Sequence, residues 1–294
     1  MPIYRLTVEY DGTKYAGWQV QPEARTVQGV LTDVLRRETG QSDLVLRGAG
    51  RTDSGVHALG QVASMECKAP LAVERLLAAL ERALPADLAV RELRQVDGRF
   101  HARHDAVLRS YRYQIARRRS AFGKRCTWWV REPIDTRAMA SAAAHFVGRH
   151  DFAALSRRDP AQTSTLVVVE ECRVVDLGEL VLVRIVASHF LWGQVRRMVG
   201  ALVAVGRGEA SPNEVPGWLS GVAAPPDETA PASGLFLEKV LFAGEPAELP
   251  PLLPVGVPWF GGIEEQRSSP RRGTYAGARR SAGGAGRRRR GVSS

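Results

Sequence analysis

The chain has 294 residues, of which 44% are hydrophobic and 24% are charged, a composition typical of a globular protein with one large domain or two small ones. No stretch approaches the ~18 apolar residues that span a bilayer, and residues 1–6 lack the basic start and apolar core of a secretory signal. The three cysteines are scattered without C-x-x-C spacing, which argues against a disulfide framework and a zinc site. We therefore expect a cytoplasmic protein without a membrane span.

The net charge of +10 is concentrated near the C-terminal end. Residues 266–294 hold nine of the 41 basic residues and no acidic one, which leaves 32 basic residues against 31 acidic ones in the body. Any nucleic-acid surface on the body must therefore be a local patch. Residues 245–294 are rich first in proline and then in arginine and glycine, and we expect them to form a disordered tail that attracts phosphates without specificity.

The first half of the chain predicts the order β-α-β-β-α-β. Apolar residues alternate with polar ones from Tyr4 to Tyr10, which indicates a half-buried strand, and Thr26 can cap a helix that ends at Gly40. The remaining expected elements are strands over residues 44–47 and 61–67, a helix over 73–84 and a strand over 88–96. This order is that of a ferredoxin-like unit.

The second half predicts the same order without similarity in sequence. We expect strands over residues 110–116, 166–175, 180–187 and 234–242, and helices over 135–147 and 190–205. The sequence thus predicts an α+β fold of two ferredoxin-like βαββαβ halves, residues 1–105 and 106–244. Their mainly antiparallel sheets would join around a central cleft, with the strand order across the junction left open.

One glycine-rich stretch, residues 48–61, surrounds the carboxylate Asp53 with four glycines and lies between two apolar runs. Glycine permits positive φ and close approach to a ligand, so the stretch predicts a shaped loop between two strands. On spacing alone, Asp53 could equally cap an ordinary turn.

The string GRTDSGVHALGQV, residues 50–62, closely resembles the signature loop of the tRNA pseudouridine synthase A family, in which the aspartate is catalytic. Shorter matches extend the resemblance over about residues 3–242: YDGT at 10–13, GWQ at 17–19, FHAR at 100–103, HDF at 150–152 and SGL at 233–235. The resemblance implies an isomerase that converts uridine to pseudouridine at position 38, 39 or 40 of the tRNA anticodon stem-loop. It also implies a homodimer of two-part subunits and the pseudouridine synthase fold.

This isomerisation breaks the N1–C1′ glycosidic bond, turns the uracil and rejoins it through C5. Because it involves neither redox change nor group transfer, we expect no cofactor. Asp53 could attack the sugar at C1′, attack the base at C6, or remove a proton from C2′. The sequence leaves these three roles open.

Two arginines are candidates to support Asp53. Arg196 lies in FLWGQVRRMVG, residues 190–200, which resembles the family's helix motif whose arginine pairs with the catalytic aspartate. A charge that enters an apolar helix also needs a partner. Arg51 lies in the same loop as Asp53 and could instead hold an RNA phosphate or the backbone of the flipped nucleotide.

Three further residues are candidates for substrate binding. Tyr111 resembles the family's tyrosine that stacks on the uracil and assists proton removal at C5, whereas we expect its neighbour Tyr113 to be core. Arg103 lies in a matching string and is expected to contact RNA, and Leu237 lies in a segment matching a motif beside the active site.

Two other classes of protein are alternatives to this one. A non-catalytic RNA-binding protein would carry an RNP1-type string, which is absent, and would leave Asp53 unexplained. A hydrolase of N-glycosidic bonds could use the same carboxylate but would release free uracil. His101 and His104 have H-x-x-H spacing without a nearby carboxylate or cysteine cluster, so we expect no metal site.

Overall fold

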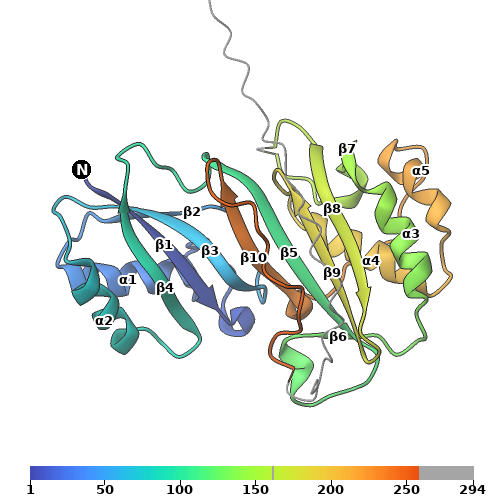
Figure 1. Cartoon of the computed structure of the whole chain (residues 1–294), viewed down its shortest axis with the longest axis horizontal. Helices are drawn as coiled ribbons and strands as arrows, with labels where there is room; N and C mark the ends of the chain where they lie inside the picture. The colour runs from blue at the N-terminus through green and yellow to red at the C-terminus, as the bar shows by residue number, and fades with distance from the viewer. Residues whose placement is uncertain (161, 258–294) are drawn as a thin grey trace, which may run out of the picture.

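Strands from both halves of the chain join into one ten-stranded sheet (Figure 1). The structure, a computed structural model, describes residues 1–160 and 162–257. The strand order is β4-β1-β3-β10-β5-β9-β8-β7, with β2 added beside β3 and β6 beside β5. The sheet is mainly antiparallel, as the sequence predicts; the pairs β10–β3 and β5–β6 are parallel.

The first half of the chain follows the predicted order closely. Its elements are β1 (Ile3–Tyr10), the 3-10 turn η1 (Gly12–Lys14), α1 (Val27–Thr39), β2 (Val45–Gly48), β3 (His57–Glu66), α2 (Val73–Ala83) and β4 (Leu88–Val96). Thr26 caps α1 by accepting a hydrogen bond from the Gly29 N–H at 3.2 Å. Gly40 ends the helix in the left-handed region at φ 68°.

The second half contains the predicted elements and several short ones that the sequence did not indicate. Its elements are β5 (Ala106–Ala116), η2 (Gly123–Arg125), β6 (Trp128–Trp129), α3 (Thr136–His145), β7 (Gly148–Asp151), η3 (Ala153–Leu155), β8 (Leu166–Asp176), β9 (Leu180–Ala187), α4 (Gln194–Gly206), η4 (Pro212–Glu214), α5 (Val215–Leu219), η5 (Ala232–Gly234) and β10 (Leu235–Phe242). The helix expected from residue 190 begins only at Gln194, because Gly193 takes a left-handed conformation with φ 72°. Residues 190–193 therefore form a separate loop before α4.

The last strand, β10, connects the two halves. It pairs antiparallel with β5 and parallel with β3, where Phe236 lies opposite His57 and Leu237 lies opposite Ala58. This answers the question of strand order that the sequence left open. The strand after the Asp53 stretch and the strand that carries Tyr111 are consequently separated only by β10.

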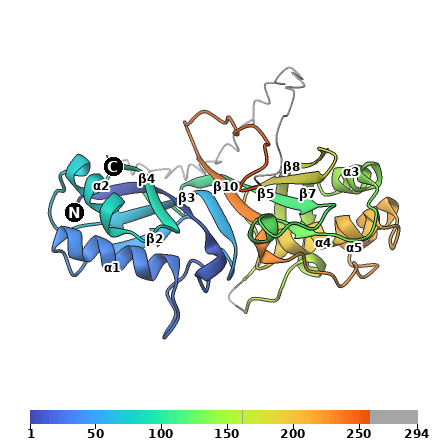
Figure 2. The same cartoon turned by 90° about the horizontal axis from the view of Figure 1, so that it is seen from below.

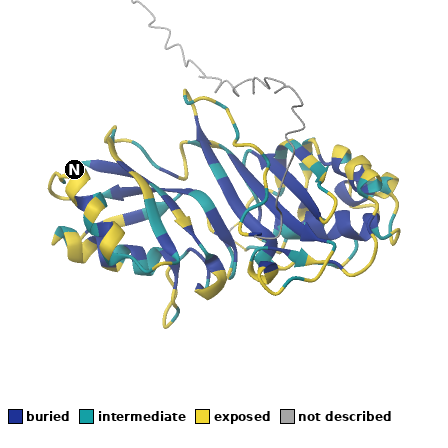
Figure 3. Cartoon of the chain, turned by 60° about the horizontal axis from the view of Figure 1, so that its bottom comes forward, coloured by how far each residue is buried: buried dark blue, intermediate teal, exposed yellow. Residues whose placement is uncertain are grey.

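The two faces of the sheet are covered differently. Figure 2 shows α1 and α4 on one face and the segment that follows β10 on the other. The central strands are buried along most of their length, whereas the outward turns of the helices are exposed (Figure 3). On the face opposite the helices, the fully buried carboxylate of Glu238 accepts hydrogen bonds from Ser110, Arg112 and Arg184.

Residues 245–257 differ from the disordered tail that the sequence predicts. Glu245 pairs with Arg5 and Arg94, and the carbonyls of Pro250, Pro251 and Leu253 accept hydrogen bonds from Arg184 and Arg112. The amide of Gln114 exchanges two hydrogen bonds with Val255, at 2.7 and 2.8 Å. We call residues 245–257 the strap. Polar side chains of the sheet hold its backbone, an interaction that hydropathy does not reveal. Residues 258–294 lie outside the described part of the chain.

Candidate active site

Asp53 lies in the loop between β2 and β3, which we call the Asp53 loop (residues 49–56). Residues that precede α1 in the first half of the chain hold this loop in place. The backbone N–H of Trp18 donates to the Thr52 carbonyl at 3.1 Å, and the Thr52 Oγ1 lies 2.8 Å from the buried hydroxyl of Tyr10. Gly17 has φ +96°, and a Cβ there would lie 2.6 Å from the Thr52 carbonyl oxygen. Only glycine combines this conformation with this approach, so Gly17 positions the loop.

Arg109 of β5 holds the loop from the second half. Its buried guanidinium donates to the carbonyls of Ala49, Arg103, Ala106 and Ser188 at 3.2, 2.8, 3.0 and 2.8 Å. Burial lowers the pKa of Arg109, but an arginine remains protonated in a protein. Four carbonyls compensate the buried charge. Arg109 therefore ties together the start of the Asp53 loop, the turn before β5 and the segment after β9.

Arg196, in the first turn of α4, reaches Asp53 from the other half of the chain. Its Nη1 lies 3.4 Å from Asp53 Oδ2, and the two side chains are 18% and 29% exposed. Its Nε donates to the Ala230 carbonyl at 2.7 Å, while the Ala230 N–H donates to the Arg196 carbonyl at 3.1 Å. The structure thus brings together the two residues that the sequence motifs single out.

Tyr111 and Leu237 lie beside this pair on neighbouring strands. Tyr111 is opposite Leu237 in the β5–β10 pairing, and the ring of Phe190 meets the Tyr111 ring edge-on at 5.0 Å between centroids. Burial, with a smaller contribution from the charge of Asp53, raises the pKa of Tyr111. Tyr111 is therefore a neutral phenol within electrostatic reach of Asp53. Tyr113 is core as expected, fully buried with its hydroxyl donating to the Pro231 carbonyl at 2.7 Å.

The other two arginines predicted for the site lie on the surface. Arg51 and Arg103 are both exposed, and neither makes an ion pair with Asp53. Arg103 contributes to the site through its backbone, because its carbonyl accepts from Arg109. Both side chains are exposed and can therefore contact a bound ligand.

Sequence reasoning gave no role to Arg109 or Phe190, although Arg109 lies two residues before Tyr111 and Phe190 begins the string FLWGQVRRMVG. Arg109 shares the inward face of β5 with Tyr111 and Tyr113, at spacings of two and four residues. A charge on the buried face of a strand needs several partners. The spacing of Arg109 from the two tyrosines is therefore a sequence signal that Arg109 is buried and holds other groups. Phe190 had no comparable signal, because its place depends on where α4 begins.

Across residues 1–160 and 162–257, no group of three or more His, Cys, Asp or Glu side chains is placed to hold a metal ion. The rings of His101 and His104 lie 4.2 Å apart, without a third such residue to complete a site. Within the same residues, no helix has the length and apolar content needed to cross a membrane.

A partly exposed carboxylate, oriented by a guanidinium and flanked by a neutral phenol, is an arrangement typical of an enzyme that uses nucleophilic or acid–base catalysis. Residues 6–105 and 142–243 match the sequence pattern of a family described as tRNA pseudouridine synthase. The chain belongs to this family of isomerases.

Similar proteins from several bacteria share most of their length with the chain. The tRNA pseudouridine synthase A of Moorella thermoacetica is 42% identical over 82% of this chain and 99% of its own length. Proteins of the same name from Pelobacter propionicus and Syntrophotalea carbinolica are 42% and 43% identical, over 82% and 83% of this chain and 100% and 97% of their own lengths. Among solved structures, a Cbf5-Nop10-Gar1 complex aligns with 68% of this chain and 54% of its own at 12% identity, with a TM-score of 0.29, too low to bear on the fold.

Proposed function

We propose that the protein isomerises uridine to pseudouridine at one or more of positions 38, 39 and 40 of the tRNA anticodon stem-loop, with Asp53 as the catalytic carboxylate. The observation that carries this proposal is the pairing of Asp53 with Arg196 across the junction of the two halves. Relatives of 42% identity named tRNA pseudouridine synthase A support tRNA as the substrate. A homodimer in the cytoplasm is part of the same proposal.

In this proposal, Asp53 acts as an anion on a nucleotide that has left the base stack. The N1–C1′ bond breaks, C5 bonds to C1′, the proton on C5 is lost and N1 gains one, so the reaction needs no external reactant. Arg196 offers the carboxylate a positive charge and a hydrogen-bond donor, which orients the anion for attack on C1′ or C6 or for proton removal at C2′.

Tyr111 supplies the face on which the uracil stacks. An extruded base is stabilised by an aromatic side chain, and stacking is worth about 1–3 kcal/mol per base. The raised pKa of Tyr111 keeps its phenol neutral, which suits stacking against an uncharged base. Leu237, fully buried opposite Tyr111, supports the ring from the neighbouring strand. The exposed side chains of Arg51 and Arg103 contact the RNA backbone.

The test is pseudouridine mapping on unmodified tRNA transcripts by carbodiimide (CMC) adducts, with free uracil measured in the same reactions. We expect a signal at one or more of positions 38–40 with the wild type and none with Asp53→Asn, while Asp53→Asn still binds tRNA. Asp33→Asn, which removes an exposed carboxylate of α1, is the matched control and should retain the signal. Release of uracil would indicate a hydrolase, and binding without either product would indicate a non-catalytic RNA-binding protein.

A further inference from the structure

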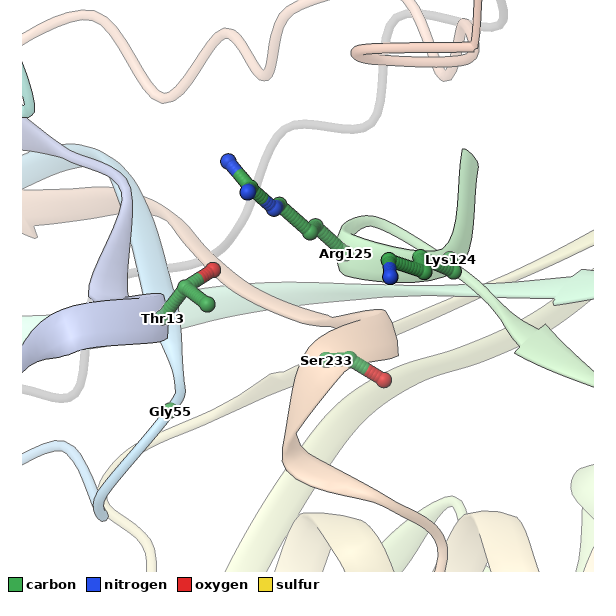
Figure 4. A pocket seen from close by; sticks show the side chains of 5 residues that line it. All are labelled: Thr13, Gly55, Lys124, Arg125 and Ser233. Atoms are coloured by element: carbon green, nitrogen blue, oxygen red, sulfur yellow. The ribbon is translucent and has the colours of Figure 1, made fainter. Parts of the chain in front are cut away.

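A hollow of about 350 Å³ opens beside the Asp53 loop, at Gly55. Thr13, Gly55, Lys124, Arg125 and Ser233 line it (Figure 4). These residues come from η1, the Asp53 loop, η2 and η5, so the hollow lies where both halves of the chain meet. Ala230, which holds Arg196, is three residues before Ser233. The Asp53 loop and the segment of residues 230–233 therefore contribute both to the hollow and to the Asp53–Arg196 pair.

The charge of the hollow is positive. Lys124 and Arg125 are exposed, and neither has a carboxylate within ion-pair distance in the described part of the chain. Arg117 and Arg118, earlier in the same segment, are instead neutralised by Asp176 at 2.7 Å and Glu179 at 3.0 Å. Asp11, which accepts a hydrogen bond from the Thr13 hydroxyl, interacts electrostatically with Arg125 but forms no ion pair with it. The two cations that line the hollow are thus open to an anionic ligand.

The backbone that carries these cations is fixed. The buried ring of His57 lies with its Nε2 2.7 Å from the Arg125 carbonyl oxygen and stacks on Phe236 at 4.6 Å between centroids. Thr127 Oγ1 donates to the Gly123 carbonyl at 3.0 Å, and Ser233 Oγ donates to the Thr127 carbonyl at 3.3 Å. His57 directly follows the Asp53 loop, so the position of Arg125 is coupled to that loop. A rigid support lowers the entropy lost when a ligand binds.

A second hollow provides a contrast. It is larger, about 560 Å³, and includes Lys14, Arg25 and Asp87 in its lining. The Arg25 guanidinium already makes two hydrogen bonds to Asp87, at 3.0 and 3.2 Å, and lies over the Tyr15 ring. Its charge is therefore largely satisfied within the protein.

We propose that the hollow at Lys124 and Arg125 binds a backbone phosphate of the RNA strand next to the reacting nucleotide. The inference rests on the proposed function in taking RNA as the ligand. Arginine and lysine are the side chains that most often contact phosphate oxygens, and such contacts set the register of a nucleic acid without reading its sequence. The hydroxyl groups of Ser233 and Thr13 already donate within the protein, to Thr127 and Asp11. The two cations therefore carry the binding.

A phosphate held at this place would position the strand relative to Asp53. The Asp53 loop contributes Gly55 to the wall of the hollow, and Gly55 has φ +79° with a Cβ position 3.2 Å from Ala232. A larger residue at position 55 would thus crowd the η5 wall. Lys124 and Arg125 are positioning residues in this proposal, because they act on the strand and touch no reacting atom.

The test measures tRNA binding as a function of salt in an Asp53→Asn background, so that no product forms. The probe is an unmodified tRNA transcript, and the variant is Lys124→Ala combined with Arg125→Ala. Each lost phosphate contact should reduce the slope of log K against log[salt] by about 0.7–0.9. We expect a slope lower by about 1–2 and a Kd raised on the order of tenfold. The thermal midpoint should match that of the parent, because both side chains are exposed.

Arg91→Ala is the matched control. Arg91 is an exposed arginine of the edge strand β4, next to Glu9, and is not part of the hollow. With Asp53 intact, the double variant should raise the KM for tRNA, whereas Arg91→Ala should leave it unchanged. Lys124→Arg combined with Arg125→Lys keeps both charges and should restore most of the affinity.

The outcomes separate this inference from the proposed function. An unchanged slope in the double variant, or a loss of affinity equal to that of Arg91→Ala, would overturn the phosphate site even if the wild type makes pseudouridine. A reduced slope in a protein that makes no pseudouridine would support the phosphate site and reject the proposed function.

Discussion

Arg196 and Asp53 are 143 positions apart in the chain and meet at 3.4 Å, with the guanidinium of Arg196 also bound to the carbonyl of Ala230. The Ala230 N–H donates back to the Arg196 carbonyl, so side chain and backbone are both held. The fork of the guanidinium is thereby aimed at the carboxylate before any substrate binds. Such preorganisation is a common source of catalytic power.

Replacing Arg196 by lysine should abolish most activity while the charge is kept. A lysine ammonium cannot donate to the Ala230 carbonyl and to Asp53 with the fixed geometry of a guanidinium. The loss of one charge-assisted hydrogen bond is worth about 1.5–3 kcal/mol, so kcat should fall roughly 10–150-fold. Single-turnover assays of Arg196→Lys and Arg197→Lys would check this. Arg197 forms an ion pair with the exposed Asp227 at 3.6 Å and none with Asp53, so its variant should keep near wild-type activity.

Replacing Gly17 by alanine should destabilise the protein and impair the Asp53 loop. The added Cβ would lie 2.6 Å from the Thr52 carbonyl oxygen at a φ of +96°. A strained conformation of this kind costs about 1–3 kcal/mol. Urea unfolding and activity should both show the effect. Gly98→Ala is the control, because nothing lies within 4 Å of its Cβ position and its φ is not in the left-handed region; a loss of stability equal to that of Gly17→Ala would contradict this account.

Removing the strap should lower the thermal stability of the sheet. A chain that ends at Gly244 loses the carbonyls that accept from Arg112 and Arg184 and the reciprocal hydrogen bonds between Gln114 and Val255. At about 1 kcal/mol per hydrogen bond, partly offset by chain entropy, the loss should be about 2–3 kcal/mol, or roughly 5–10 °C in Tm. A chain that ends at Val257 is the reference, so that the difference measures the strap alone. Equal melting temperatures would show that the strap contributes nothing to the stability of the sheet. Gln114→Ala, which removes the two hydrogen bonds to Val255, gives a milder test in the full chain.

Acid should weaken the ion pair between Asp176 and Arg117. Hydrogen bonds from Arg117, followed by those from Thr136 and the Gly178 N–H, lower the pKa of Asp176 from 3.8 to about 2. Because the unfolded chain then binds the proton more readily, this contribution to stability is present above about pH 4 and is lost as the pH falls toward 2. The Asp176 side chain is 39% exposed, so solvent screening limits the contribution to about 0.5–1 kcal/mol. Urea titrations of the wild type and Asp176→Asn at pH 2 and pH 7 would check it: the two should differ at pH 7 and converge near pH 2.

The sequence predicts the elements of this fold well because most of them have local signals. Apolar periodicity, the Thr26 cap and the glycine at position 40 are enough to place β1 and α1 within one or two residues. The pairing of β10 with β3 has no such signal, because it joins residues about 180 positions apart and depends on the whole sheet. The sequence predicts disorder for the strap for a related reason. Polar side chains of β5 and β9, far away in the chain, hold its backbone, and no local pattern shows these contacts.

The candidate site divides in the same way. The motif around Asp53 and the helix motif around Arg196 can both be recognised in the sequence, and the structure brings these two residues together. Lys124 and Arg125 could not be singled out, because every residue from 117 to 119 is also an arginine. Only the positions of Asp176 and Glu179 show which cations of this segment are neutralised.

The ladder that joins the two halves is narrow: β10 pairs with β3 through two residue pairs and with β5 through seven. Asp53 and Arg196 lie on opposite sides of this seam. A local opening along it would part the two side chains while each half kept its own strands and helices. Mild denaturant should therefore abolish activity before circular dichroism detects any loss of secondary structure. Among the amides of residues 57, 58, 236 and 237, those that point across the seam should exchange their hydrogens before the other amides of the central strands.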